Sequence, residues 1–434
     1  MHARHRLTAA AVPVLLVTAA WLHAGPINPP AGPIVSTNKT LLEVEPRTVI
    51  NAANTPGDVD SVFRITQPGS YYIAGNLTGT VGKSGIEIAA DNVTIDLGGF
   101  TLQGAPGALT GITSAGIVRT GVHVRDGTVQ GWPVDGAFVI GASHRFTRVN
   151  AISNTGRGLA SASAAFDSCI ASSNGGHGFN TSDNCHYVAC TARANGGDGF
   201  AANVNAVFDR CIASTNSGAG ISFGGGTATS CVSSNNGTSG YSALSGAAFH
   251  GCLSRGNTQQ GFLTGAGALL VNCEANNSPG HGIVAGTGST VRQCVADSNL
   301  MTGIQAATRS SVVDCTSSGN SNDGIRVSDN CLVANNQCVS NGLPLAGAGI
   351  HATGVDNRIE GNNVTGNGRG IDVDATGSVI VRNTASGNST NFDIAAGNRY
   401  GPIVDIVALG TPAVTGSSAA GTMTSSDPLA NFAY

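Results

Sequence analysis

Charged side chains are scarce in this chain. Of its 434 residues, 21 are Lys or Arg and 25 are Asp or Glu, which amounts to 11% charged residues and a formal net charge of only −4, against roughly 25% charged residues in an average soluble protein. Lysine occurs only at Lys39 and Lys83, and the arginines stand singly. A nucleic-acid-binding protein concentrates Lys and Arg in a basic stripe, so the composition argues against nucleic acid as a partner.

Proline and aromatic residues are also few, whereas glycine is abundant. There are 15 prolines, aromatic residues make up 5% of the chain, and 62 residues are glycine. Collagen needs glycine at every third position together with abundant proline, so a collagen-like chain is excluded. Hydrophobic residues make up 41% of the sequence, which excludes a wholly disordered polar chain.

The longest apolar run lies at the N-terminus. A basic segment, residues 1–6, is followed by apolar residues up to Leu22 and by the small residues Ala20 and Ala24. This order is typical of a secretory signal peptide, and the run is shorter than the roughly 20 residues that span a membrane. We therefore expect residues 1–24 to be a signal peptide cleaved after Ala20 or Ala24. The remaining chain would have no membrane span and would be secreted or located at the cell surface or in the periplasm.

A period of about 21 residues runs through the middle of the chain. Nine cysteines mark it with spacings of 21, 21, 20, 21, 21, 21, 21 and 23 residues: Cys169, Cys190, Cys211, Cys231, Cys252, Cys273, Cys294, Cys315 and Cys338. Nine residues after each of the first eight stands a glycine, which is followed by Phe, Tyr or Ile. Five residues after the cysteine stands an asparagine, with Ser278 as the one exception. A repeat this short does not suit a helix pair and is typical of one coil of short strands and tight turns.

The repeated positions predict how each coil is built. Columns of Cys, of Ala or Ser, and of Phe or Ile would fill the interior of a stack whose strands lie about 4.8 Å apart. The repeated glycine would supply the positive φ angle of a corner. The repeated asparagine would turn the chain and hydrogen-bond to the Asn side chains of adjacent coils. The sequence therefore predicts an all-β solenoid with an asparagine ladder.

The repeat also predicts where the parts of the chain begin and end. We count about 12 coils of about 21 residues and assign residues 91–395 to them. Because the open ends of a solenoid need protection, residues 25–90 are expected to form an N-terminal cap with the first strands. Residues 396–434 are expected to form a C-terminal cap or tail.

The 11 cysteines are interpreted as core residues rather than as a disulfide framework. Strands about 4.8 Å apart hold the Cβ atoms of stacked cysteines farther apart than the roughly 3.8 Å that a disulfide prefers. Cys185 falls in a second small column, five residues before the main one, and Cys331 follows the same Ser-Asp-Asn sequence. The sequence leaves open whether these two stay reduced. No cluster of Cys and His has the spacing of a zinc site, so no metal site is predicted.

With these Gly-x-Gly-Ile repeats the chain resembles the secreted right-handed parallel β-helix proteins of the pectin-lyase-like superfamily. The resemblance covers residues 60–400 and implies a right-handed, single-stranded parallel β-helix. It does not specify an activity, because that superfamily includes pectate lyases, polygalacturonases, alginate epimerases, phage tailspikes and adhesins.

One outward column, just after the Phe or Ile position, contains most of the candidate site residues. There Arg326, His351 and Asp372 would stack in three successive coils. Arginine can neutralise a sugar carboxylate, histidine can act as acid or base near neutral pH, and aspartates can transfer protons or bind a divalent cation. We assign the candidate catalytic residues Arg326, His351, Asp372 and Asp323, and the candidate substrate-binding residues Arg369 and Asp374. The alternative is that all six are solvated turn residues that pair with one another.

A second outward column lies just before the repeated glycine. It would place Arg157, His177 and Asp198 above one another in successive coils, and we assign these three as further candidate substrate-binding residues. The alternative is again a structural one, because the same column also contains Ala and Ser.

The enzyme motifs of the superfamily are mostly missing. Polygalacturonases carry Asn-Thr-Asp, Asp-Asp, Gly-His-Gly and Arg-Ile-Lys, whereas this chain has only Gly-His-Gly, at 176–178 and 280–282. The Asp-Pro-His motif of alginate epimerases is absent as well. We therefore predict an exported protein that binds a polysaccharide or cell-envelope glycan along one face, in a binding or structural role.

The alternative function is enzymatic. A polysaccharide lyase or glycoside hydrolase would act on a uronic-acid-containing polysaccharide, and stacking would separate Asp323 and Asp372 widely enough for an inverting hydrolase. No cofactor is predicted, and calcium is left open as a ligand.

Overall fold

The computed structural model describes residues 44–114, 116–343, 347–405 and 426–433. The chain divides into two units, Met1–Pro46 and Arg47–Tyr434. The predicted signal peptide lies outside the described residues, and the β-structure belongs to the second unit. Every regular element in the described part of that unit is a β-strand. Within the same part, we find no helix with the length and hydropathy needed to cross a bilayer.

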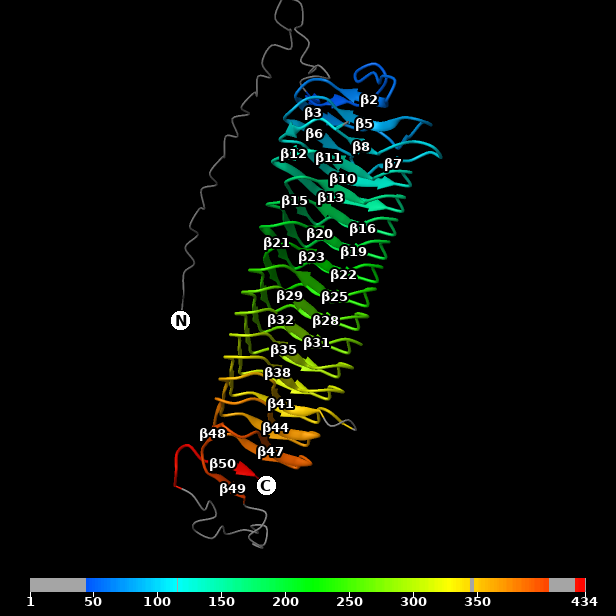
Figure 1. Ribbon diagram of the computed structural model, residues 1–434. Coiled ribbons are helices and arrows are strands. Elements are labelled where there is room, and N and C mark those ends of the chain that lie inside the picture. Colours follow the sequence, from blue (N-terminus) through cyan, green and yellow to red (C-terminus); the bar gives the residue numbers. More distant parts are fainter. Residues whose placement is uncertain (1–43, 115, 344–346, 406–425, 434) are drawn as a thin grey trace, which may run out of the picture. The chain divides into compact units, whose positions relative to one another are not determined.

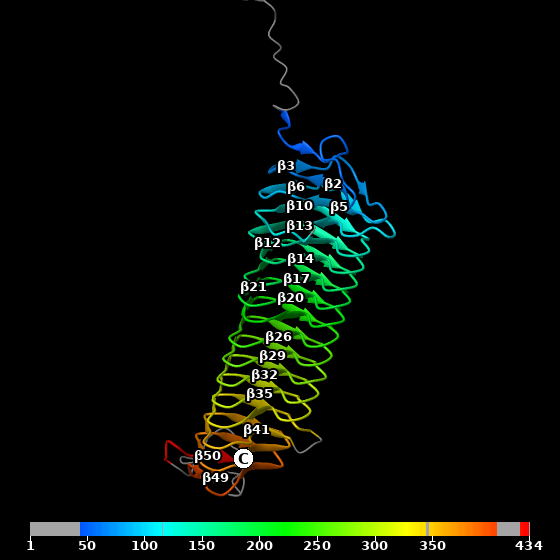
Figure 2. The same cartoon turned by 45° about the horizontal axis from the view of Figure 1, so that its top comes forward.

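The strands form a stack of parallel coils (Figure 1). One sheet, here sheet B, has 16 strands, one from each coil, and runs from β2 (Ser61–Ile65) to β47 (Thr390–Ile394). A second sheet of 32 strands, here sheet A, contributes two strands to each regular coil. The same stacking is seen when the unit is tilted (Figure 2). The predicted parallel solenoid is confirmed.

One regular coil shows the pattern. It contains β17 (Phe179–Thr181) of sheet B, then β18 (His186–Val188) and β19 (Thr191–Arg193) of sheet A, and leads to β20 (Phe200–Ala202) of sheet B. In-register pairing of β17 with β20 sets Phe179 beside Phe200, 21 residues later.

The predicted number of coils, about 12, is too low. Four strands of sheet B precede the regular coils: β2, β5 (Ser84–Ile88), β8 (Ile112–Thr113) and β11 (Ala137–Val139). Their coils lack the Cys and Asn columns because they enclose a different core. Trp132 is fully buried there, and a Cβ atom on Gly79 or Gly85 would lie within 2.7 Å of its indole ring.

Both ends of the described unit contain strands that pair with the coils. β1 (Thr48–Val49) pairs with β3 (Gly69–Tyr72) within the range expected for the N-terminal cap and first strands. In the range expected for the C-terminal cap, β48 (Arg399–Tyr400) pairs with β45 (Val379–Val381), and β50 (Asn431–Ala433) pairs with β46 (Thr384–Ser386). The domain limits themselves stay predictions.

The cysteines form a buried ladder of free thiols, as predicted. All 11 are unpaired and buried, and burial raises the pKa of thiols such as Cys169 well above the ordinary value. Cys338, however, was wrongly taken as the ninth member of the column, because it pairs in register with Ser317. Asn336 occupies the cysteine position instead, and its Oδ1 accepts the backbone N–H of Cys315 at 2.9 Å.

The asparagine ladder is confirmed, but its backbone role was mislocated. The side-chain amide of Asn195 donates to Oδ1 of Asn216 at 2.9 Å, and Oδ1 of Asn195 accepts from Asn174 at the same distance. The positive φ angle lies one residue earlier, at Ala194 with φ 55°. The Asn side chain must point inward to reach its neighbours, so the preceding residue makes the turn.

The repeated glycines are needed for space rather than for a positive φ angle. A Cβ atom on Gly199 would lie 2.6 Å from the carbonyl oxygen of Gly220 and 2.7 Å from the amide nitrogen of Asn216. Neither distance is tolerable for a carbon atom in van der Waals contact. The glycine column therefore lets the Asn ladder and the next coil approach the backbone closely.

Candidate functional site

Three neighbouring strands of sheet B position the predicted site: β38 (Ile325–Val327), β41 (Ala348–Ala352) and β44 (Arg369–Val373). The side chains of a strand alternate between the two faces of its sheet, so the middle residue of each coil's strand points outward. In-register pairing places Arg326 beside His351, and His351 beside Asp372. The three residues therefore follow one another on the outer face of sheet B.

His351 lies among three carboxylates. Its Nδ1 is 3.1 Å from Oδ2 of Asp323, and its Nε2 is 2.9 Å from Oδ2 of Asp374 and 3.5 Å from Oδ2 of Asp372. The side chains of Asp323 and Asp372 are each only 3% exposed, whereas that of Asp374 is 55% exposed. We call these four residues, together with Arg369, the His351 cluster.

Arg369 joins the cluster through Asp372. Its Nη1 lies 2.6 Å from Oδ2 of Asp372 and 3.7 Å from Oδ2 of Asp393 in β47. Asp393 pairs in register with Asp372 and was missed in the sequence. Extending the outward column by one more coil would have found it, because it stands 21 residues after Asp372.

The surroundings of the cluster shift its proton affinities in different directions. Burial acts to lower the pKa of His351, but the hydrogen bonds to Asp323 and Asp374 outweigh it and raise that pKa above its ordinary value. Burial raises the pKa of Asp372. Burial acts to raise the pKa of Asp323 as well, but hydrogen bonds from His351 and from the N–H of Ala348 outweigh it and lower that pKa. Opposite shifts in neighbouring carboxyl groups are typical of acid–base pairs.

Arg326 differs from the other charged residues of the site. It is half-buried at the middle of β38, and within the described residues no carboxylate lies at ion-pair distance from it. An outward guanidinium without a carboxylate partner has donors available for a ligand.

Three members of the cluster have the geometry to hold a divalent cation. One ligand atom each from His351, Asp372 and Asp374 lies within 4.8 Å of the others. Carboxylate oxygens suit calcium, and the added imidazole also suits transition metals. If calcium binds this protein, these three side chains are the candidate ligands.

Comparison with known proteins adds the handedness of the fold. Residues 262–390 match the family described as right handed beta helix region. This stretch is a right-handed β-helix region. No curated protein sequence matches the chain.

Several solved structures resemble this β-helix. They include the A-module of the mannuronan C-5 epimerase AlgE4 of Azotobacter vinelandii, with 18% identity and a TM-score of 0.31 over 76% of this chain and 90% of that one. The periplasmic alginate epimerase AlgG has 11% identity and a TM-score of 0.39 over 72% and 75% of the two chains. The receptor-binding tailspike protein of bacteriophage Det7 has 14% identity and a TM-score of 0.40 over 81% and 75%. At these identities the likeness concerns the fold and not the site.

The second predicted patch of the β-helix is divided. His177 and Asp198 are neighbours: Nδ1 of His177 accepts the N–H of Asp198 at 2.9 Å, and Oδ1 of Asp198 accepts the N–H of Ala219 at 2.7 Å. Each side chain thus accepts a backbone N–H from the next coil. This contact favours the structural alternative for His177 and Asp198.

Arg157 turns away from these two residues. Its Nη2 lies 2.7 Å from Oδ2 of Asp135, and its guanidinium lies 4.4 Å from the ring centroid of Phe138, which stands outward in β11. Asp135 was missed in the sequence, although it occupies the same column 22 residues earlier. Arg157, Asp135 and Phe138 therefore form a small group of their own on the sheet B side of the β-helix.

Proposed function

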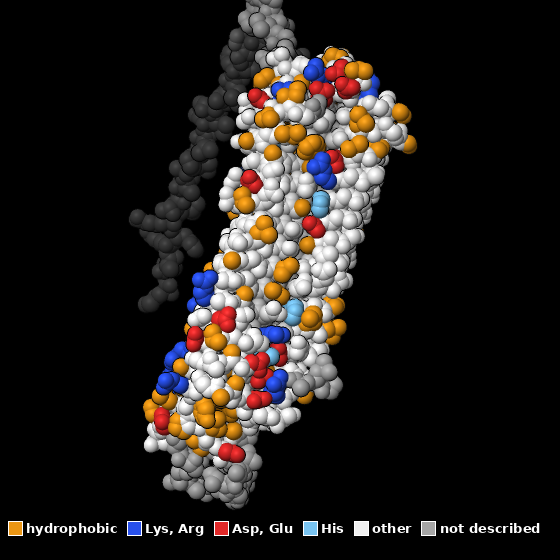
Figure 3. Space-filling model, in the orientation of Figure 1, with side chains coloured by type: hydrophobic (Ala, Val, Ile, Leu, Met, Phe, Trp, Pro, Cys, Tyr) orange, Lys and Arg blue, Asp and Glu red, His pale blue; other side chains and the backbone are white. Residues whose placement is uncertain are grey.

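We propose that this protein binds a polysaccharide along the outer face of sheet B, with Arg326 and the His351 cluster as its main contact. The observation that supports this most is the concentration of charge on one face of a chain with 11% charged residues. Figure 3 shows two groups of acidic, basic and histidine side chains, one above the other, on the visible face. These correspond to the pairs around Arg157 and around His351.

The distance between the two groups favours a polymer as the ligand. Nine steps of sheet B separate β14 (Leu159–Ser161), next to Arg157, from β41 with His351, which is roughly 40 Å at the usual strand spacing. An extended chain can contact both groups, whereas a single small molecule cannot.

The surface between the two groups does not obstruct such a chain. Its outward column consists of short or uncharged side chains: Asn180, Ala201, Ser222, Ser242, Leu263, Val284 and Gln305. Because each coil repeats the last, these side chains form a flat array that an extended polymer can follow.

Arg326 indicates that the ligand is acidic. Its guanidinium has no carboxylate at ion-pair distance among the described residues, and an arginine fork binds a carboxylate through two parallel hydrogen bonds. A uronic-acid unit supplies such a group. The predicted signal peptide would place this face outside the cytoplasm, where such glycans occur.

Catalysis on the same ligand is the second candidate. The opposite pKa shifts of Asp323 and Asp372 support it. These carboxylates, however, contact the two opposite nitrogens of His351, so the imidazole fills the space in which an inverting hydrolase holds sugar and water. The geometry therefore supports binding better than hydrolysis by this pair.

The proposal is tested by measuring the affinity of the purified protein for a uronic-acid polysaccharide and for a neutral one. We expect binding of the acidic polymer, weakened about tenfold by Arg326→Gln, since a hydrogen bond to a charged group contributes about 1.5 kcal/mol or more. Arg255→Gln is the matched control, because Arg255 is an exposed arginine in β28 (Leu253–Arg255) of sheet A. Absence of binding, or equal weakening by both variants, would contradict the proposal.

The same samples separate binding from catalysis. Ultraviolet absorbance of unsaturated uronate that disappears in His351→Ala would demonstrate a lyase. New reducing ends without that absorbance would demonstrate hydrolysis. Binding without either product is the result that the geometry predicts.

A further inference from the structure

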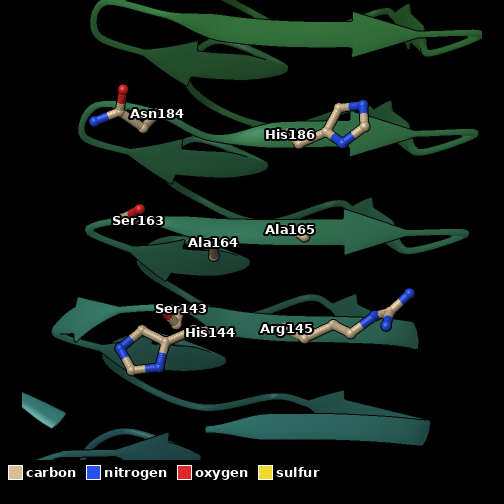
Figure 4. A pocket seen from close by; sticks show the side chains of 8 residues that line it. All are labelled: Ser143, His144, Arg145, Ser163, Ala164, Ala165, Asn184 and His186. Atoms are coloured by element: carbon tan, nitrogen blue, oxygen red, sulfur yellow. The ribbon is translucent and has the colours of Figure 1, made fainter. Parts of the chain in front are cut away.

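A second hollow lies on sheet A, away from the His351 cluster. It is a cavity of about 490 Å³ at the start of β13 (His144–Ile152), β15 (Ala164–Asp167) and β18 (His186–Val188), and Figure 4 labels the eight residues that line it. A volume in the range of about 300–1,000 Å³ is typical of small-molecule sites. We call it the Arg145 pocket.

Its shape results from one small residue between two large ones. In-register pairing sets Arg145 beside Ala165 and Ala165 beside His186 in three successive coils. Figure 4 shows the two nitrogen-bearing side chains above and below the single methyl group of Ala165. The space that a longer side chain would fill is therefore left open between a guanidinium and an imidazole.

The lining offers hydrogen-bond donors and no carboxylate. Among the described residues, no Asp or Glu lies at ion-pair distance from Arg145 or His186. The side-chain oxygen of Asn184 already accepts from the amide of Asn205 at 3.2 Å, so the NH₂ group of Asn184 is the part left to donate. Ser143 and Ser163 add hydroxyl groups.

A buried donor without a partner also belongs to this lining. His144 is only 2% exposed, and its Nδ1 accepts the N–H of Val122 at 3.3 Å. Burial lowers the pKa of His144 against the opposing effects of the Ile140 carbonyl and Asp91. The neutral ring therefore carries its proton on Nε2, and that atom is buried without a hydrogen bond of acceptable geometry. Buried donors in this state are rare in folded proteins and indicate an acceptor that is not part of the chain.

We propose that the Arg145 pocket binds an acidic sugar, with the carboxylate between Arg145 and His186 and the sugar hydroxyls against Asn184 and the two serines. The guanidinium fork matches a carboxylate, and the cavity is larger than a bare anion requires. The site lies on a different sheet from Arg326, so it does not depend on the function proposed above.

Calorimetric titration of the full chain with three probes tests the proposal: galacturonate, the neutral sugar galactose, and inorganic sulfate. Galacturonate should bind at least tenfold more tightly than either of the others. Arg145→Gln should weaken its binding at least tenfold, whereas Arg255→Gln and Arg326→Gln should leave it unchanged. Loss of binding in Arg326→Gln alone would instead locate the sugar at the His351 cluster and overturn the assignment.

A second variant tests the shape of the pocket without removing a charge. Ala165→Phe places a ring in the gap while Arg145 and His186 remain, and we expect galacturonate binding to be abolished. Ala165→Val is its control, because Val207 already occupies the same column of β21 (Ala206–Asp209), and unchanged thermal unfolding would show that both variants fold. Equal affinity for galactose, equal affinity for sulfate, or no binding of any probe would each overturn the proposal.

Discussion

At the scale of single residues, the proton on His351 is coupled to the stability of the fold. The folded state raises the pKa of His351, so its contribution is fully present below the unfolded-state pKa of about 6.5 and is lost as the pH rises through the folded-state value. The folded state lowers the pKa of Asp323, so its contribution is present above about 3.9 and is lost as the pH falls through the folded-state value. The pair therefore stabilises the protein most between about pH 4 and 6.5. Asp372, whose pKa is raised by burial, acts in the opposite direction to Asp323.

Replacing His351 should expose this window. We expect His351→Gln to lower the urea midpoint at pH 5.5 by an amount that corresponds to roughly 1 kcal/mol, since the ion pairs of the cluster are partly buried, and to lower it much less at pH 9. The measurement is urea unfolding of both proteins at the two pH values. His250→Gln is the control, because His250 stands outward in β27 (Ala248–His250) without a carboxylate at ion-pair distance among the described residues. A loss that is equal at both pH values would show that the charge of His351 plays no part.

At the scale of the coil, the asparagine ladder has one gap that makes its contribution measurable. The side-chain amide of Asn236 donates to Oδ1 of Asn257 at 2.9 Å, and its own Oδ1 accepts the N–H of Asn216 at 3.0 Å. Ser278 interrupts the ladder, and its buried Oγ has no hydrogen-bond partner. The chain thus already contains a broken rung for comparison.

We expect opposite effects from changes at the two rungs. Asn236→Ala leaves buried backbone and amide groups without partners and should cost about 2–4 kcal/mol, at about 1–3 kcal/mol for each group. Ser278→Ala should be nearly neutral, and Ser278→Asn should raise the melting temperature by reconnecting Asn257 with Asn299. Thermal unfolding of the three variants checks this. A destabilising Ser278→Asn would show that the gap exists for reasons of space.

The regular coils could be predicted from the sequence because each coil packs against a copy of itself. Every interior position then demands the same side chain 21 residues later, and the columns of Cys, Asn and Phe or Ile become visible. The coils around Trp132 could not be recognised in this way, because one large side chain there replaces several small ones. The exchange of Cys338 for Asn336 was also hidden, because a two-residue shift within a coil changes which column a cysteine enters.

The site could be predicted as far as a column can show it. Register alone brings Arg326, His351 and Asp372 together, and one more coil adds Asp393. The Arg145 pocket has no such signal, because it depends on a missing side chain at Ala165 and on a tautomer of His144 that the fold imposes.

At the scale of the whole molecule, the solenoid hides its thiols along most of its length. Each coil contacts only its neighbours, so the buried column is continuous and no single loop covers it. All 11 cysteines are free and buried, and burial raises the pKa of Cys338 and Cys190 above the ordinary value. Reaction of a thiol therefore requires both opening of the stack and formation of a thiolate that the interior disfavours.

The reactivity of these thiols should report the integrity of the stack. We expect the native protein at neutral pH to show almost no reaction with an aromatic disulfide reagent over the time in which the unfolded protein reacts completely. In denaturant without a reductant, 11 thiols should be released at once, the number that the sequence contains. Variants that weaken the ladder, such as Asn236→Ala, should react faster in the native state, because opening of one coil exposes the cysteines of its neighbours. A count below 11 in denaturant would mean that some stacked cysteines are oxidised, contrary to the column of free thiols.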